Sequence, residues 1–443
     1  MTSPKGPAPA RSRQEPAGVA TRRLAAHAFR RILAERRQIE DAIGFEGGST
    51  LSLQDYSLAR AILTVSFRRY GSIRAALRSR ARTGDIPDAG LLMPVLVTAA
   101  AQVLYMDVPD HAAVDVAIEI IKADGDARHF ANLANAILRG IGREKATILG
   151  MEDSFAMDTP EWLLARWQGA YGAIAAEAIA RVHQSEPPVD LTIFGSPEPL
   201  VAAVPGTMLA SQSYRLATTN SIPSLPGYAE GQFQVQDVAA ALPARLIPAG
   251  PGWMVLDLCA APGGKTAQLA ATGAEVVAVE RSAQRAARLS ENLERLKLKA
   301  EVVIADALTF TREGFDAVLL DAPCSATGTI RRHPEIAWTK TLADILTLSV
   351  QQQKMLDAAA RLVRQGGLLV FATCSLEPEE GERQVERFLT RNTHFQRRPI
   401  ETGEAGIPDE MITSIGDFRA LPSHLVTHGG ADGFFAARLQ RIG

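Results

Sequence analysis

Two cysteines in this 443-residue chain stand where a thiol can do chemistry. Cys324 lies in "DAPCSAT" after the apolar run 317–320, and Cys374 lies in "FATCSLE" after the apolar run 368–372. Each follows an expected strand and lies next to helix or turn signals, where oriented backbone N–H groups lower a thiol pKa and favour the reactive thiolate. We therefore expect a lowered pKa and a chemical role for both. The third cysteine, Cys259, is interpreted as a small residue that permits close backbone approach.

The rest of the composition argues against several other classes. An odd set of three cysteines does not suit a disulfide framework, and no Cys-x-x-Cys spacing predicts a metal site. No run of 18 apolar residues predicts a membrane span. Residues 1–17 are rich in Pro, Ala, Ser and Arg, which predicts a disordered basic tail rather than a secretory signal. We expect a cytoplasmic monomer.

A glycine-rich turn, "LDLCAAPGGKTAQLA", occupies residues 256–270. It ends like a phosphate loop, but Cys259 stands where that loop needs its first glycine. The alternative is the first turn of a doubly wound sheet that binds an adenosine-containing cofactor, with an acid about 20 residues later for the ribose. Glu280 follows the next apolar run and fits that spacing. The candidate turn consists of Cys259, Ala260, Ala261, Pro262, Gly263, Gly264 and Lys265.

Alternating strands and helices from residue 236 onward must position these groups. Short apolar runs predict buried parallel strands at 254–258, 276–279, 300–304, 317–320 and 368–372. Helices are expected at 283–298 and 345–364, the latter closed by Gly366. Parallel strands end at one edge of a sheet, so the turn at 257–265, Glu280, Asp306 and the two cysteine segments should meet there. The fold class is α/β, with the catalytic domain at 236–443.

Two further segments precede this domain. Apolar residues at helical spacing predict an all-helical domain at 18–147, with helices near 20–36, 53–70, 91–105, 114–121 and 130–141. Residues 148–235 form a small mixed connector, with a helix over 162–183 and strands near 187–194 and 233–235. Residues 1–82 carry sixteen Lys or Arg against six Asp or Glu. This excess is either a solvated helical surface or an electrostatic footprint for nucleic acid.

Several motifs together carry a family resemblance. "DAPCS" resembles the Pro-Cys motif of cytosine-C5 methyltransferases, and "TCS" resembles the Thr-Cys motif of their RNA-acting branch. With "CAAPGGKT" and "GTIRRHPEIAW", the chain resembles the NOL1/NOP2/Sun family of RNA cytosine-C5 methyltransferases. The segments "HAAVDVAIEI" and "ANLANAILR" resemble the NusB RNA-binding fold, "GQFQVQDVAA" the family's lead-in, and "ADGFFAARL" its last strand. The resemblance implies a Rossmann-like methyltransferase domain behind a NusB-like domain.

The resemblance also implies a role for each candidate residue. Cys374 would attack C6 of a cytosine as the nucleophile, and Cys324 would assist product release, since covalent catalysis divides one hard step into easier ones. Asp321 would bond the N3 edge of the base and border the cofactor. S-adenosylmethionine would lie in the turn, with its ribose on Glu280 and its adenine near Asp306. RNA phosphates would be held by Arg331, Arg332 and His333.

The function indicated is methylation of cytosine C5 in RNA, with 16S ribosomal RNA as the expected substrate. A non-catalytic RNA-binding or antitermination module would suit the helical domain alone but leaves the cysteine pair unused. A small-molecule or protein methyltransferase would explain the cofactor turn but not the basic front domain. A DNA cytosine methyltransferase would use Cys324 as nucleophile and would not require Cys374.

Overall fold

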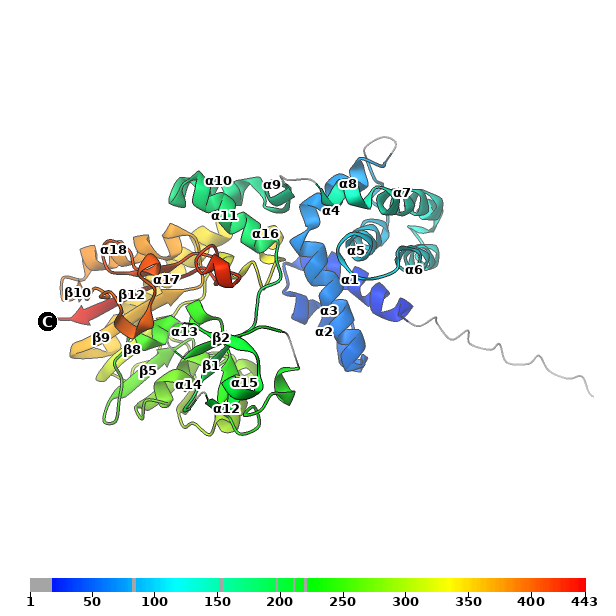
Figure 1. Cartoon of the computed structure of the whole chain (residues 1–443). Coiled ribbons are helices and arrows are strands. Elements are labelled where there is room, and N and C mark those ends of the chain that lie inside the picture. Colours follow the sequence, from blue (N-terminus) through cyan, green and yellow to red (C-terminus); the bar gives the residue numbers. More distant parts are fainter. Residues whose placement is uncertain (1–17, 82–84, 151–153, 197, 210–211, 219–220) are drawn as a thin grey trace, which may run out of the picture. The chain divides into compact units, whose positions relative to one another are not determined.

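The computed structural model describes residues 18–81, 85–150, 154–196, 198–209, 212–218 and 221–443 (Figure 1). Its contacts divide the chain into two compact units, Met1–Asp158 and Thr159–Gly443. The division falls after Asp158 rather than after residue 147, and helix α8, Lys145–Leu149, runs across the expected boundary. The basic tail expected at 1–17 lies outside the described residues.

The first unit is helical, as its apolar spacing predicts. Phe29 in α1 stacks on Phe67 in α3 with ring centroids 4.6 Å apart, and Tyr70 in α4 meets Phe29 edge-on. Helix α5 is buried along almost its whole length and forms the centre of the core. The sequence prediction missed α2 and the start of a new helix at Tyr70. The α-helices described here are α1 Val19–Glu35, α2 Ile39–Phe45, α3 Leu53–Arg68, α4 Tyr70–Arg78, α5 Leu92–Tyr105, α6 Asp110–Ala123, α7 Ala131–Arg143, α8 and α9 Ser154–Asp158.

The second unit is organised around an eight-stranded sheet in the order β10-β12-β9-β8-β5-β6-β7, with β11 paired to β12. Strands β5 to β9 are parallel, and β12 runs antiparallel between β9 and β10. This confirms the predicted α/β class. The strands are β5 Met254–Leu258, β6 Glu275–Glu280, β7 Glu301–Ile304, β8 Phe315–Asp321, β9 Val363–Thr373, β10 Phe395–Arg397, β11 Phe418–Ala420 and β12 Phe434–Arg441.

Helices cover both faces of this sheet (Figure 1). Side chains alternate along each strand, so Val255 packs in the core shared with α13 while Leu256 packs in the core shared with α17 and α18. Because β5 to β9 are parallel, their carboxyl ends lie at one edge of the sheet. The α-helices are α13 Val238–Arg245, α14 Gly264–Ala270, α15 Ala283–Leu296, α16 Ile336–Thr339, α17 Leu342–Leu362 and α18 Glu382–Arg391.

The segment before this sheet carries two helices and a small antiparallel sheet in the order β2-β3-β1-β4. The helix predicted over 162–183 is divided in two, because Gly172 adopts a φ of 85°. The strands predicted near 187–194 and 233–235 are present as β1 and β4, whereas β2 and β3 were missed. The elements are α10 Glu161–Tyr171, α11 Ala173–His183, β1 Asp190–Ile193, α12 Glu198–Ala203, β2 Gly206–Met208, β3 Ser213–Leu216 and β4 Phe233–Val235.

One predicted helix end is wrong. Helix α17 ends at Leu362, and β9 begins at the next residue, so Gly366 does not close the helix. Gly366 instead lies inside β9 with a φ of 78°, where the pairing with β8 is irregular between Phe315 and Ala317. Within the described part of the chain, no helix is long and apolar enough to cross a membrane.

Candidate active site

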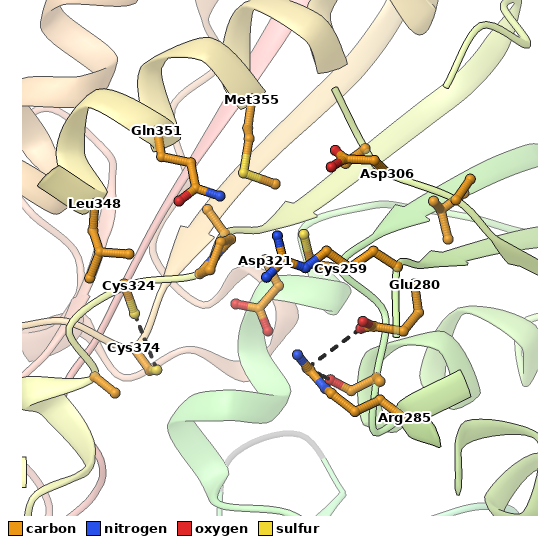
Figure 2. A pocket seen from close by; sticks show the side chains of 18 residues that line it. Cys259, Glu280, Arg285, Asp306, Asp321, Cys324, Leu348, Gln351, Met355 and Cys374 are labelled. Atoms are coloured by element: carbon orange, nitrogen blue, oxygen red, sulfur yellow. Dashed lines mark hydrogen bonds and ion pairs between the residues drawn. The ribbon is translucent and has the colours of Figure 1, made fainter. Parts of the chain in front are cut away.

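The carboxyl ends of the parallel strands border a cavity of about 360 Å³. This is the edge of the sheet where open α/β folds bind ligands. Figure 2 shows side chains from the ends of β6 and β8, the segments after them and α17 around it. The predicted residues that line it are Cys259, Ala261, Glu280, Asp306, Asp321, Cys324 and Cys374; the rest of the turn, Ala260, Pro262, Gly263, Gly264 and Lys265, is not part of its lining.

The turn between β5 and α14 is narrow. Cys259 has a φ of 62° and Gly263 a φ of 102°, and the Gly263 amide donates to the Ala260 carbonyl at 2.8 Å. A Cβ atom at Gly263 would lie 3.1 Å from Cγ of Leu289, so α15 packs closely against a residue without a side chain. Burial raises the pKa of Cys259 to about 12, so this thiol stays neutral. These features suit a backbone that approaches a ligand.

Glu280 fits a group that presents hydroxyls. Its side chain is 3% exposed, and Oε1 accepts a hydrogen bond from the Ser282 amide at 2.9 Å. The second oxygen, Oε2, is buried without a hydrogen bond, and its charged neighbour is Arg285 at 3.5 Å. A buried carboxylate oxygen without a donor is costly unless a ligand supplies one. The ribose of S-adenosylmethionine carries two such donors, so the residues present fit this cofactor.

Two further groups frame the same end of the cavity. Arg285 donates to the Ala261 carbonyl at 2.9 Å and so joins the glycine-rich turn to α15 (Figure 2). Asp306 follows β7, is exposed, and accepts a hydrogen bond from the Leu308 amide at 2.8 Å. This bond orients the carboxylate beside the cavity. The adenine contact expected of Asp306 remains a prediction.

An ion pair connects the cofactor turn to the cysteine side of the cavity. Lys265 Nζ donates to Asp321 Oδ2 at 2.7 Å and lies 4.8 Å from the centroid of the Phe434 ring. Asp321 keeps 30% of its side chain exposed, whereas Lys265 keeps 10%. Beneath the turn, Thr266 donates to Asp257 at 2.6 Å, and burial raises the pKa of Asp257 to about 7.

The two candidate cysteines lie together. Their Sγ atoms are 3.4 Å apart, and both are free thiols (Figure 2). The cause is the pairing of β8 with β9, in which Asp321 lies opposite Ala372, so the segments that follow leave the sheet side by side. The prediction that the two cysteine segments meet at one edge of the sheet is confirmed.

The predicted lowering of the thiol pKa is wrong for Cys324. Its hydrogen bond with Cys374, followed by burial, raises the pKa of Cys324 well above its ordinary value. A hydrogen bond from the Ala326 backbone acts in the opposite direction but is outweighed. Cys324 is therefore the thiol that keeps its proton.

The prediction that Arg331 holds RNA phosphates is also wrong. Its side chain is 1% exposed, its Nε donates to Asp432 at 2.8 Å, and its guanidinium forms a second ion pair with Asp237. Arg332 also pairs with Asp432 but keeps 39% of its side chain exposed, and His333 keeps 28%. Contact of Arg332 and His333 with RNA remains a prediction.

Helix α17 contributes cavity residues that the sequence prediction missed. Leu348, Gln351 and Met355 line the cavity opposite the sheet, and Arg285 lies at its other end (Figure 2). Their i, i+3, i+7 spacing places the three on one helix face. That spacing was available in the sequence, but nothing there indicated which part of the helix passes over the sheet edge.

The fold and this cavity define a Rossmann-like, S-adenosylmethionine-dependent methyltransferase. Residues 245–440 match the family described as 16S rRNA methyltransferase RsmB/F, and residues 19–143 match the NusB family. The chain is 35% identical over 371 residues to ribosomal RNA small subunit methyltransferase B of Pasteurella multocida, covering 79% of this chain and 80% of the relative. It therefore belongs to the RsmB/F family of methyltransferases, as the motifs around its cysteines indicated.

Two other comparisons agree with this assignment. Ribosomal RNA small subunit methyltransferase B of Pseudomonas syringae is 37% identical over 369 residues, covering 79% of this chain and 81% of that protein. The crystal structure of PH0851 superposes with a TM-score of 0.73 at 22% identity, over 97% of this chain and all of that one. The second similarity concerns the fold alone.

Proposed function

We propose that this protein methylates C5 of a cytosine in 16S ribosomal RNA through a covalent bond between Cys374 and C6 of the base. The observation that carries the proposal is the 3.4 Å separation of the Cys324 and Cys374 sulfurs at the edge of the cofactor cavity. The relatives named ribosomal RNA small subunit methyltransferase B support the choice of substrate.

Covalent catalysis is needed because C5 of cytosine is a weak nucleophile. When the Cys374 thiolate adds to C6, the electron pair of the C5–C6 bond becomes available at C5. Bound S-adenosylmethionine supplies an electrophilic methyl group on a sulfonium. Once C5 carries the methyl group, transfer of the C5 proton to water restores the C5–C6 double bond and expels the Cys374 sulfur as a thiolate, so the enzyme returns to its starting state.

The environments of the two thiols support different roles. Cys324 keeps its proton, because its hydrogen bond with Cys374 and its burial raise its pKa. A protonated Cys324 at 3.4 Å can donate a hydrogen bond to the Cys374 sulfur as that sulfur leaves C6. This arrangement favours Cys374 as the nucleophile and Cys324 as the group that assists release.

Asp321 is placed to stabilise the base as charge develops. Lys265 donates a hydrogen bond to Oδ2 of Asp321, and no hydrogen bond from another described residue reaches Oδ1 of Asp321. If Oδ1 carries a proton, it can donate a hydrogen bond to N3 of the cytosine, which orients the ring and strengthens as thiolate addition places negative charge on the base. Asp321 also borders the cofactor cavity, so it can align C5 with the methyl donor.

Replacing each cysteine by alanine tests the assignment. Cys374→Ala should form neither 5-methylcytosine nor a covalent complex, because it has no nucleophile. Cys324→Ala should still attack and methylate, and then accumulate a methylated protein–RNA adduct that survives denaturing electrophoresis. Mass spectrometry of the RNA bases supplies the second readout. Exchanged phenotypes would make Cys324 the nucleophile, and full activity in both variants would refute the covalent mechanism.

A further inference from the structure

Each candidate cysteine is followed by a serine, and the two serines meet beneath the thiols. Ser325 and Ser375 are completely buried, and their Oγ atoms are 3.3 Å apart. The cysteine side chains line the cavity, whereas the serine side chains point into the protein and away from it. In each Cys-Ser pair, the cysteine therefore borders the cavity and the serine is part of the packed interior.

The buried carboxylate of Glu380 accepts hydrogen bonds from both serine side chains. Oε1 accepts from the Ser325 amide at 2.9 Å and from Gln352 Nε2 at 3.0 Å. Oε2 accepts from Ser375 Oγ at 2.6 Å and from Ser325 Oγ. Glu380 lies in a short 3-10 turn, Pro378–Glu380, and none of its surface is exposed. Its bonds therefore join the loop after β8 to the loop after β9.

We propose that Glu380 is a positioning residue that sets the spacing of the Cys324 and Cys374 thiols. The proposal rests on the proposed function in that the spacing matters for chemistry only if both thiols act on one base. Glu380 does not line the cavity, and the hydrogen bonds of its carboxylate go to Ser325, Ser375 and Gln352 rather than to either sulfur, so it acts through the serine that follows each cysteine.

The bonds beside Glu380 do not replace it. Thr327 Oγ1 accepts from the Leu376 amide at 3.0 Å, and the Gly328 amide donates to the Cys374 carbonyl at 3.0 Å. These bonds hold the two loops near each other three and four residues beyond Cys324. The two serine hydroxyls also contact each other at 3.3 Å, but among the described residues Glu380 is the group that bonds both serines and the Ser325 amide. Its loss leaves the Ser325 amide without this acceptor and leaves Gln352 Nε2 with the Pro323 carbonyl.

The charge on Glu380 gives a second reason to expect a role. It contributes to the raised pKa of Cys324, after the hydrogen bond with Cys374 and burial. A negative group behind the loop disfavours a second negative charge on Cys324. The carboxylate therefore helps to keep Cys324 protonated while it positions the loop.

Two substitutions of Glu380 distinguish an effect on the placement of the thiols from a general effect on the stability of the protein. In Glu380→Gln, the amide oxygen can still accept from the Ser325 and Gln352 donors, and the amide nitrogen can donate to the serine hydroxyls, which rotate to accept. Glu380→Ala removes all four bonds. Glu404→Ala is the matched control, because it removes a carboxylate paired with the buried Arg438 outside the cysteine loops.

The reaction with phenylarsine oxide tests whether the two thiols lie close enough to be bridged, and it requires neither RNA nor cofactor. It condenses with two neighbouring thiols and releases one water, and intact-protein mass spectrometry counts the bridged fraction. Cys324→Ala should not be bridged, which identifies the pair measured. We expect wild-type bridging in Glu380→Gln and in Glu404→Ala, and loss of bridging in Glu380→Ala. Adduct formation with RNA should slow by about 100-fold in Glu380→Ala, the effect of a misplacement of about 1 Å.

Wild-type bridging in a folded Glu380→Ala protein overturns the proposal, and so does an equal loss in Glu404→Ala. If Glu380→Ala does not fold, Ser325→Ala removes a single hydroxyl donor and should still lower the bridged fraction. Unchanged bridging in that variant also overturns the proposal. If the wild-type protein forms no 5-methylcytosine and Cys324→Ala accumulates no RNA adduct, the proposed function fails, while the bridging assay still decides the role of Glu380.

Discussion

The affinity for S-adenosylmethionine should depend on a single oxygen atom of Glu280. The substitution Glu280→Gln keeps an acceptor for the Ser282 amide and replaces Oε2 with a nitrogen that cannot accept a hydrogen bond. In the protein as it stands, Oε2 is buried and has no hydrogen-bond donor. The ribose hydroxyls of the cofactor would supply that donor, so the variant tests the ribose assignment directly.

The expected loss follows from the environment of this oxygen. A hydrogen bond to a charged group contributes about 1.5–3 kcal/mol. Since each 1.4 kcal/mol is a factor of ten in Kd, the variant should bind the cofactor about 12- to 150-fold more weakly. Arg285 offsets little of this loss, because it lies 3.5 Å from Oε2 and its side chain is 56% exposed.

Isothermal titration calorimetry with S-adenosylmethionine measures the loss, and filter binding measures the affinity for RNA, which should not change. Glu275→Gln is the matched control, because Glu275 begins the same strand at the opposite edge of the sheet and is exposed. Wild-type cofactor affinity in Glu280→Gln would refute the ribose assignment, and an equal loss in Glu275→Gln would show a general effect on β6.

Salt titrations, unfolding curves and pH series test other parts of the molecule. Deleting residues 1–158 should flatten the salt dependence of RNA binding, which is about −0.7 per phosphate contact in log–log form, and an unchanged slope would contradict an RNA role for the basic helices. Arg331→Ala should lower the free energy of unfolding by about 3–5 kcal/mol, because Asp237 and Asp432 would be left buried without it; a denaturant midpoint equal to the wild type would contradict this. Asp257 has a pKa of about 7 when folded and about 3.9 when unfolded, so its stabilisation is complete below about pH 4 and is lost as the pH rises through 7. Asp257→Asn should lack this decline in a series of melting curves, and parallel curves for both proteins would count against it.

The parallel part of the sheet could be predicted because its strands are buried on both faces. The run 254–258 coincides with β5, and the other four predicted runs overlap β6 to β9. The connector sheet was harder to predict, since each residue of Gly206–Met208 is exposed and the strand carries no apolar alternation. Its strands are defined by pairing with distant segments, which a local pattern does not report.

The site could be predicted for a similar reason. Strand order and handedness bring the residues after β5, β6, β7, β8 and β9 to one edge, so position in the chain implied proximity in space. Arg331 could not be assigned in this way. Its two carboxylate partners lie 94 and 101 residues away in the sequence. An arginine that forms a buried ion pair cannot be distinguished by residue type from one that binds phosphate.

The paired thiols also show what a sequence cannot report about ionisation. Both cysteines follow a strand and precede a serine, so their local patterns are nearly the same. The raised pKa of Cys324 arises from contacts made across β8 and β9, first its hydrogen bond with Cys374, then its burial and the charges near it, including Glu380. A thiol that keeps its proton is a poor nucleophile but a good hydrogen-bond donor. The roles proposed for the two cysteines therefore depend on tertiary contacts, and the substitutions at Glu380 perturb those contacts.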